Sequence, residues 1–156
     1  MLAAGAKAPD IKLPDLDGHS WNLTDLLKDG PVLLAFFKIS CSTCQLTFPF
    51  LQRLADSRDG SAPRLLAISQ DDATASRGFQ ERLGVSMPTL LDVPRSWPAS
   101  NAYQIASVPS LFLVETDGKI SLASEGFDKA AIESLGERFH VAPFKESDRV
   151  PDLRPG

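Results

Sequence analysis

The sequence predicts an α/β domain with a mixed sheet, in which helices alternate with buried strands. Three apolar runs have the length and near-continuous hydrophobicity of strands covered on both faces: residues 31–38, 64–69 and 110–114. The third run turns at residues 116–119 into residues 120–123, and the two strands of such a hairpin must be antiparallel. The predicted order of elements is therefore β-α-β-α-β-α-β-β-α, which makes the sheet mixed.

The first thirty residues are predicted to form an extended or hairpin opening. Pro9, Pro14 and Asp17-Gly18 interrupt any regular element there, and residues 24–27 are expected to form a short helical turn.

A helix is predicted from about residue 42 to residue 56, because Leu46, Phe50 and Leu54 recur at intervals of four. Pro49 lies inside this helix, where it removes one backbone hydrogen bond and is expected to kink the axis.

The segment after the second strand is predicted to be helical as well. Asp71 or Asp72 can cap it, Gly84 ends it, and its apolar side consists of Ala75, Phe79 and Leu83. Residues 89–91 follow as a short strand or an extended link.

The remaining helices are a short one from Ser96 to Tyr103, with Pro98 near its start, and a final one that Asp128 caps. The apolar stripe of the final helix is Ile132, Leu135 and Phe139. Residues 1–140 are assigned to one domain, and residues 141–156, which contain three prolines, to a C-terminal tail.

Composition excludes several classes of function. The chain is 43% hydrophobic and 23% charged with a net charge of −4, so it offers no basic surface for nucleic acid and no Lys/Arg cluster for anionic membranes. No apolar stretch reaches transmembrane length, and the first residues lack the pattern of a signal peptide. We expect a cytoplasmic protein as the sequence stands, or a periplasmic one if a leader has been removed.

The only two cysteines, Cys41 and Cys44, lie where the first buried strand meets its helix. A C-x-x-C in this position is typical of a redox dithiol. Unpaired backbone N–H groups at the helix start, those of Ser42, Thr43 and Cys44, favour negative charge on Cys41, and Lys38 can add a positive charge. Cys41 is therefore predicted to be the exposed attacking thiolate and Cys44 the buried resolving thiol.

Further motifs resemble a known family. They are Gly5-Ala6-Lys7-Ala8-Pro9-Asp10, the strand leading into the C-x-x-C, Pro49 five residues after the second cysteine, Ser69-Gln70-Asp71-Asp72, Val108-Pro109-Ser110 and Asp117-Gly118-Lys119-Ile120. Over residues 5–139 the chain resembles thioredoxin-fold thiol-disulfide oxidoreductases of the TlpA/ResA type, within the AhpC/TSA-redoxin group.

The resemblance implies a three-layer α/β/α sandwich with an N-terminal extension and a central mixed sheet. It implies a cis Val108–Pro109 bond that faces the cysteines and pairs with an extended substrate segment. It also implies protein dithiols and disulfides as substrates, an upstream thiol reductant or oxidant as partner, and no cofactor besides the cysteine pair. We expect a monomer that binds neither nucleic acid nor membrane.

Two positions depart from the family pattern. Relatives often carry a glutamate at the position of Thr47 here, and thioredoxin has a buried aspartate at the position of Ala35. Water, or a depressed pKa of Cys44 itself, would then have to account for the proton of the resolving thiol. The Ser42-Thr43 dipeptide between the cysteines is also unusual, and this dipeptide tunes the redox potential.

Three alternatives compete with this interpretation. A thiol peroxidase would need the signature Pro-x-x-x-Thr/Ser-x-x-Cys, but Lys38 stands three residues before Cys41 and Phe37 seven before Cys44. A non-catalytic module could bind partners in the groove beside Pro109. A zinc site lacks ligands, since only His19 and His140 accompany the two cysteines, so no metal site is predicted and both histidines are interpreted as surface residues. Trp21, Trp97 and Tyr103 are interpreted as core or groove lining.

Overall fold

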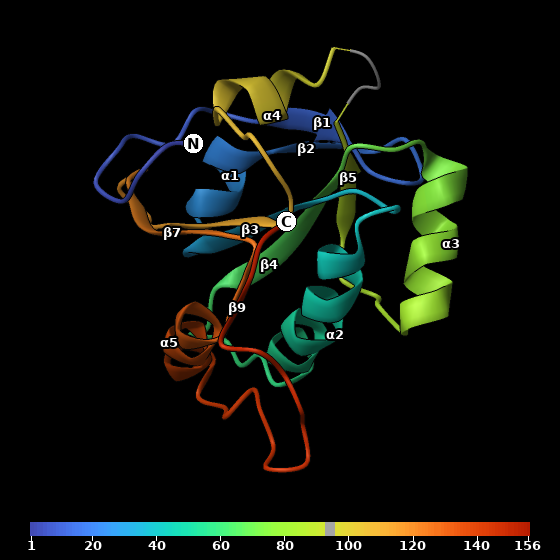
Figure 1. Ribbon diagram of the computed structural model, residues 1–156. Helices are drawn as coiled ribbons and strands as arrows, with labels where there is room; N and C mark the ends of the chain where they lie inside the picture. The colour runs from blue at the N-terminus through green and yellow to red at the C-terminus, as the bar shows by residue number, and fades with distance from the viewer. Residues whose placement is uncertain (93–95) are drawn as a thin grey trace.

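The computed structural model describes residues 1–92 and 96–156. They form three layers, with one sheet in the middle and helices on both sides of it (Figure 1). Five strands form this sheet in the order β5-β4-β3-β6-β7: Thr89–Leu91, Arg64–Ser69, Val32–Phe37, Ser110–Val114 and Ile120–Glu125. The first three pair in parallel, whereas β6 and β7 are antiparallel to their neighbours. The mixed sheet and the thioredoxin-like α/β/α architecture are therefore confirmed.

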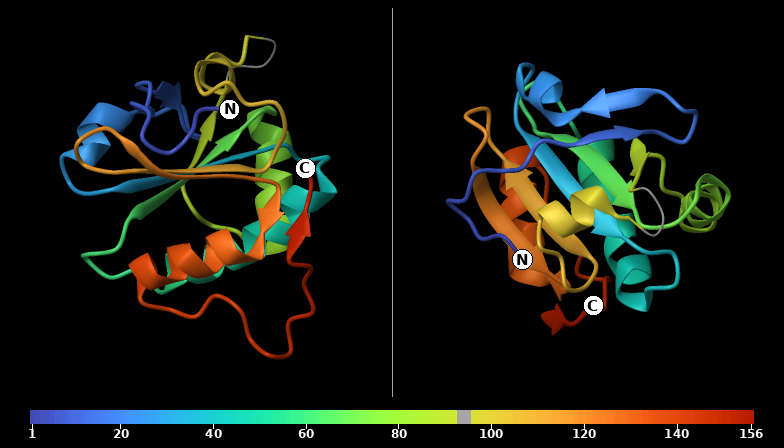
Figure 2. Two further views of the ribbon diagram at one scale, coloured as in Figure 1. Left: turned by 60° about the vertical axis from the view of Figure 1, so that its left-hand side comes forward. Right: turned by 90° about the horizontal axis from the view of Figure 1, so that it is seen from above.

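Helices cover both faces of the sheet, which is why β3 and β6 are buried along their whole length. Figures 1 and 2 show α2 (Ser42–Asp56) and α5 (Lys129–Phe139) on one face. α3 (Ala73–Leu83) packs beside α2, where the ring centroids of Phe48 and Phe79 lie 5.5 Å apart. The other face carries α1 (Leu23–Leu27), α4 (Pro98–Ala102) and the hairpin of β1 (Lys12–Pro14) and β2 (Ser20–Asn22).

The elements around the cysteines follow the sequence pattern closely. The helix predicted at 42–56 has these bounds and runs on through Pro49. Asp72, not Asp71, caps α3 by accepting from the backbone N–H of Ala75, and Gly84 ends it with a positive φ of 64°.

Helix α4 is shorter than predicted. It begins only at Pro98, because Trp97 before it adopts a left-handed conformation with φ of 38°, and it ends at Ala102. The buried Asp92 holds its start by accepting from the backbone N–H groups of Ala99 and Ser100. Asp92 lies seven residues before Ala99, so the sequence around the start of the helix does not reveal this cap.

The last sixteen residues return along α2 toward its N-terminal end (Figure 2). Phe144 packs against Phe50 and Phe127, and Arg53 on α2 forms an ion pair of 2.7 Å with Asp148. The chain then forms β9 (Leu153–Arg154), which pairs antiparallel with β8 (Phe127–Asp128). Neither short strand was predicted from the sequence.

The predicted surface and core residues are mostly where they were expected. His19 and His140 are exposed, Tyr103 is fully buried and Trp21 is half-buried. Trp97 is 42% exposed, so its interpretation as core or groove lining is wrong. No helix in the described part of the chain combines the length and the hydrophobicity needed to cross a membrane.

Candidate active site

Cys41 is the N-cap residue of α2, placed there by the end of strand β3. Its Sγ accepts a hydrogen bond from the backbone N–H of Cys44 at 3.1 Å and lies 3.3 Å from the carbonyl oxygen of Val108. The side chain is half-buried and belongs to a groove at the surface. The unpaired N–H groups at the helix start and the helix dipole both favour a negative sulfur in this position.

Cys44 lies one turn into the helix and is completely buried. Burial above all, and then its interaction with the Cys41 side chain, raises the pKa of the Cys44 thiol. The expectation that Cys44 could ionise unaided because its pKa is depressed is therefore wrong. Both cysteines are free thiols, with the second held neutral under the first.

The Val108–Pro109 peptide bond is cis, as the family resemblance implies. Pro109 comes directly before β6, and both residues are buried. The carbonyl oxygen of Val108 faces Cys41 and brings the two motifs together across 67 positions of sequence.

The supporting residues predicted from the sequence fall into two groups. Lys38, Ser42 and Thr43 line the groove beside Cys41. Thr47 and Pro49 do not line it, and Thr47 Oγ1 donates to the carbonyl oxygen of Thr43 at 2.7 Å. Thr47 stands where the family resemblance led us to expect a glutamate in many relatives, and its hydroxyl is used in this hydrogen bond within the helix.

The groove has a volume of about 540 Å³ and includes a wall that the sequence did not reveal. Arg154, Pro155 and Gly156 form this wall. Thr43 Oγ1 donates to the carbonyl oxygen of Pro155 at 2.7 Å, and the Arg154 guanidinium donates to Ser42 Oγ at 2.9 Å. Both middle residues of the C-x-x-C motif are thus bound to the end of the described chain.

The relation of Asp71 to the site was also not predicted from the sequence. Asp71 follows β4, and its Oδ2 accepts from the backbone N–H of Ile39 at 2.8 Å, two residues before Cys41. Its negative charge is one of the contributions that raise the pKa of Cys44. The sequence pattern alone pointed only to a helix cap at this position.

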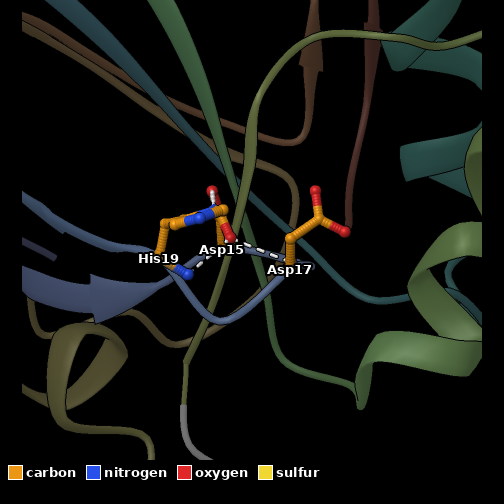
Figure 3. A group of neighbouring side chains, drawn as sticks. All are labelled: Asp15, Asp17 and His19. Atoms are coloured by element: carbon orange, nitrogen blue, oxygen red, sulfur yellow. Dashed lines mark hydrogen bonds and ion pairs between the residues drawn. The ribbon is translucent and has the colours of Figure 1, made fainter.

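A cluster of Asp15, Asp17 and His19 is the one group of the described residues with the spacing of metal ligands (Figure 3). Asp15 Oδ1 already accepts from the backbone N–H groups of Asp17 and His19, and its Oδ2 from the indole N–H of Trp21. The Trp21 hydrogen bond is the main reason why the pKa of Asp15 is lowered. The cluster is explained by the turn between β1 and β2.

Comparison with known proteins places this geometry in a family. The profile of the AhpC/TSA family matches residues 4–123, well over half of the chain. The chain belongs to the AhpC/TSA family. The thiol-disulfide oxidoreductase ResA of Geobacillus kaustophilus is 31% identical over 120 residues, which cover 76% of this chain and 67% of that protein.

Other relatives agree on the fold and divide on the chemistry. A protein of Mycobacterium tuberculosis named as a peroxiredoxin is 29% identical over 138 residues, covering 78% of this chain and 84% of its own. The thioredoxin domain of a thiol-disulfide oxidoreductase from Bacteroides vulgatus superposes with a TM-score of 0.76 at 24% identity, over 89% of this chain and 99% of that one. The AhpC/TSA family member therefore has a thioredoxin fold, and its two cysteines form a C-x-x-C motif.

Proposed function

We propose that this member of the AhpC/TSA family exchanges electrons with protein dithiols and disulfides through Cys41 and Cys44. One observation carries the proposal: a half-buried cysteine caps a helix, a fully buried one lies a turn further along it, and the carbonyl oxygen of a cis-proline segment lies 3.3 Å from the sulfur of the first. The relation to ResA supports the same chemistry.

The cycle consists of two thiol-disulfide exchanges. The Cys41 thiolate attacks a substrate disulfide, forms a mixed disulfide and releases the first substrate thiolate. The Cys44 thiol gives its proton to water and attacks Cys41 Sγ, which forms the Cys41–Cys44 disulfide and releases the second thiolate. Two electrons pass to the substrate, and the same steps in reverse oxidise a dithiol.

The backbone beside Val108 serves the substrate in this proposal. An extended segment that carries the substrate cysteine pairs there and brings its sulfur to Cys41. All of these groups come from one chain, so the proposed catalytic unit is a monomer, with an upstream thiol compound to restore the starting redox state.

Trapping tests this assignment. Cys44→Ser mixed with insulin should accumulate a mixed disulfide on Cys41, because the resolving thiol is missing, whereas Cys41→Ser should accumulate none. Mass spectrometry under non-reducing conditions identifies the linked peptide. Equal trapping by both variants, or none by either, would contradict the assignment.

Peroxide consumption distinguishes the peroxidase alternative. The chain lacks the threonine or serine three residues before either cysteine that the peroxidase signature requires. The reduced wild-type protein should therefore reduce insulin disulfides far faster than it consumes hydrogen peroxide. Faster consumption of hydrogen peroxide than of insulin disulfides would favour the interpretation as a peroxiredoxin-like thiol peroxidase.

A further inference from the structure

The groove beside Cys41 has an uneven charge. Lys38 and Arg154 are the charged residues that line it, and no Asp or Glu of the described chain does. The protein as a whole carries a net charge of −4, so this positive groove contrasts with the rest of the molecule. The two cations lie far apart in the sequence and line the same groove beside the dithiol.

Arg154 is held in this place by the backbone around it. It pairs with Phe127 in the β8–β9 ladder, and its guanidinium donates from Nη2 to Ser42 Oγ, next to Cys41. Gly126 allows the backbone of Arg154 to pass close to it. Its φ is 73°, and a Cβ there would lie 2.5 Å from the carbonyl oxygen of Arg154.

The residues on either side of Arg154 are fixed as well. The backbone carbonyl of Asp152 accepts from Lys129 N–H at 2.9 Å, and Pro155 is bound by Thr43. Gly156 packs so closely on Val108 that a Cβ would collide with the carbonyl oxygen of that residue. The segment therefore forms a fixed wall of the groove, and its guanidinium lines the same groove as Cys41.

We propose that Arg154, together with Lys38, makes this groove selective for substrates with acidic groups next to the reacting cysteine. The inference rests on the proposed function and specifies its substrate class. A guanidinium offers planar, charge-assisted hydrogen bonds to a carboxylate, and a positive groove raises the local concentration of anionic partners. A basic substrate segment would instead face two like charges.

Three end-blocked tripeptide disulfides test the selectivity: the symmetrical dimers of Asp-Cys-Asp, Asn-Cys-Asn and Lys-Cys-Lys. The reduced protein reacts with each in stoichiometric amounts, so its own dithiol supplies the two electrons. Each rate is divided by the rate of the same peptide with dithiothreitol, which removes the effect of flanking charge on the peptide sulfur itself. The wild type should favour the aspartate peptide over the asparagine peptide by about threefold, with the lysine peptide slowest.

Variants assign the preference to its residues. Arg154→Gln keeps a hydrogen-bond donor for Ser42 but removes the charge, and it should bring the normalised rates toward equality. Lys38→Gln, on a different segment, should reduce the same preference. Arg149→Gln removes an exposed charge of the same tail outside the groove and should leave the preference intact.

Each other result has a definite meaning. Equal normalised rates in the wild type would overturn the inference while leaving the proposed function standing. An equal acceleration of all three peptides by Arg154→Gln would overturn it too, because the segment would then act as a cover and not as a charge selector. Failure to exchange with any of the peptides would count against the proposed function itself.

Discussion

Cys44 is the residue whose chemistry the fold controls most strongly. It is fully buried and its pKa is raised, and neither Ala35 nor Thr47 can supply a carboxylate to accept its proton. Asp71 is a carboxylate that does act on it, through space and with the sign that opposes ionisation. The structure therefore opposes ionisation of the resolving thiol, so the resolving step should become faster as the pH rises.

The effect of Asp71 can be measured directly. Asp71→Asn removes a negative charge that raises the pKa of Cys44, while the amide oxygen can still accept from Ile39 N–H. The thiol should then ionise at lower pH, and the pH–rate profile for release from a Cys41 mixed disulfide should shift toward lower pH.

Asp72→Asn is the matched control, since asparagine is an equally good cap for α3 and the neighbouring charge is lost in the same way. An unchanged profile in Asp71→Asn, or a shift toward higher pH, would show that Asp71 does not act on Cys44 as an opposing charge.

Helix α2 is the element on which the site depends. Its first turn presents both cysteines and binds the end of the chain, whereas its last turn holds the tail through Arg53 and Asp148. The path of residues 141–156 is thus fastened at both ends of one helix. Hydrogen bonds from the side chain of Arg53 and the backbone N–H of Lys145 lower the pKa of Asp148 to about 2.

This ion pair predicts a pH dependence of stability. A carboxyl group whose pKa is lowered from an ordinary value near 3.8 stabilises the fold above that value, and the contribution is lost as the pH falls toward 2. Asp148→Asn should lower Tm relative to the wild type above pH 4, and the difference should shrink between pH 4 and pH 2.

Asp29→Asn serves as the control, because this exposed carboxylate forms no ion pair within the described part of the chain. Calorimetry of the three proteins across this pH range gives the comparison. A Tm difference for Asp148→Asn that stays constant down to pH 2 would contradict the role of the pair.

At the scale of the whole molecule, the sequence predicted what depends on local pattern. The strand before Cys41 and the helix after it were identified from hydrophobicity and periodicity, because burial of both faces of a central strand leaves an unbroken apolar run. The cis Val108–Pro109 bond came from the family resemblance alone.

The part that the sequence did not predict depends on distant backbone contacts. Thr43 and Pro155 are 112 residues apart, and their hydrogen bond leaves no hydrophobic period to detect. The same holds for the close packing of Gly156 on Val108 and for the short β8–β9 ladder. The position of the groove could therefore be predicted from the C-x-x-C motif. The wall formed by Arg154, Pro155 and Gly156, and the charge that it adds, could not be predicted.

The central claim is that the fold leaves the Cys41 thiol accessible for attack and keeps the Cys44 thiol buried. Alkylation of the reduced protein with iodoacetamide tests this claim most directly. Peptide mass spectrometry over time should show Cys41 modified at least about tenfold faster than Cys44, with the two rates converging only when urea unfolds the chain. Equal rates in the folded protein, or faster modification of Cys44, would contradict the account.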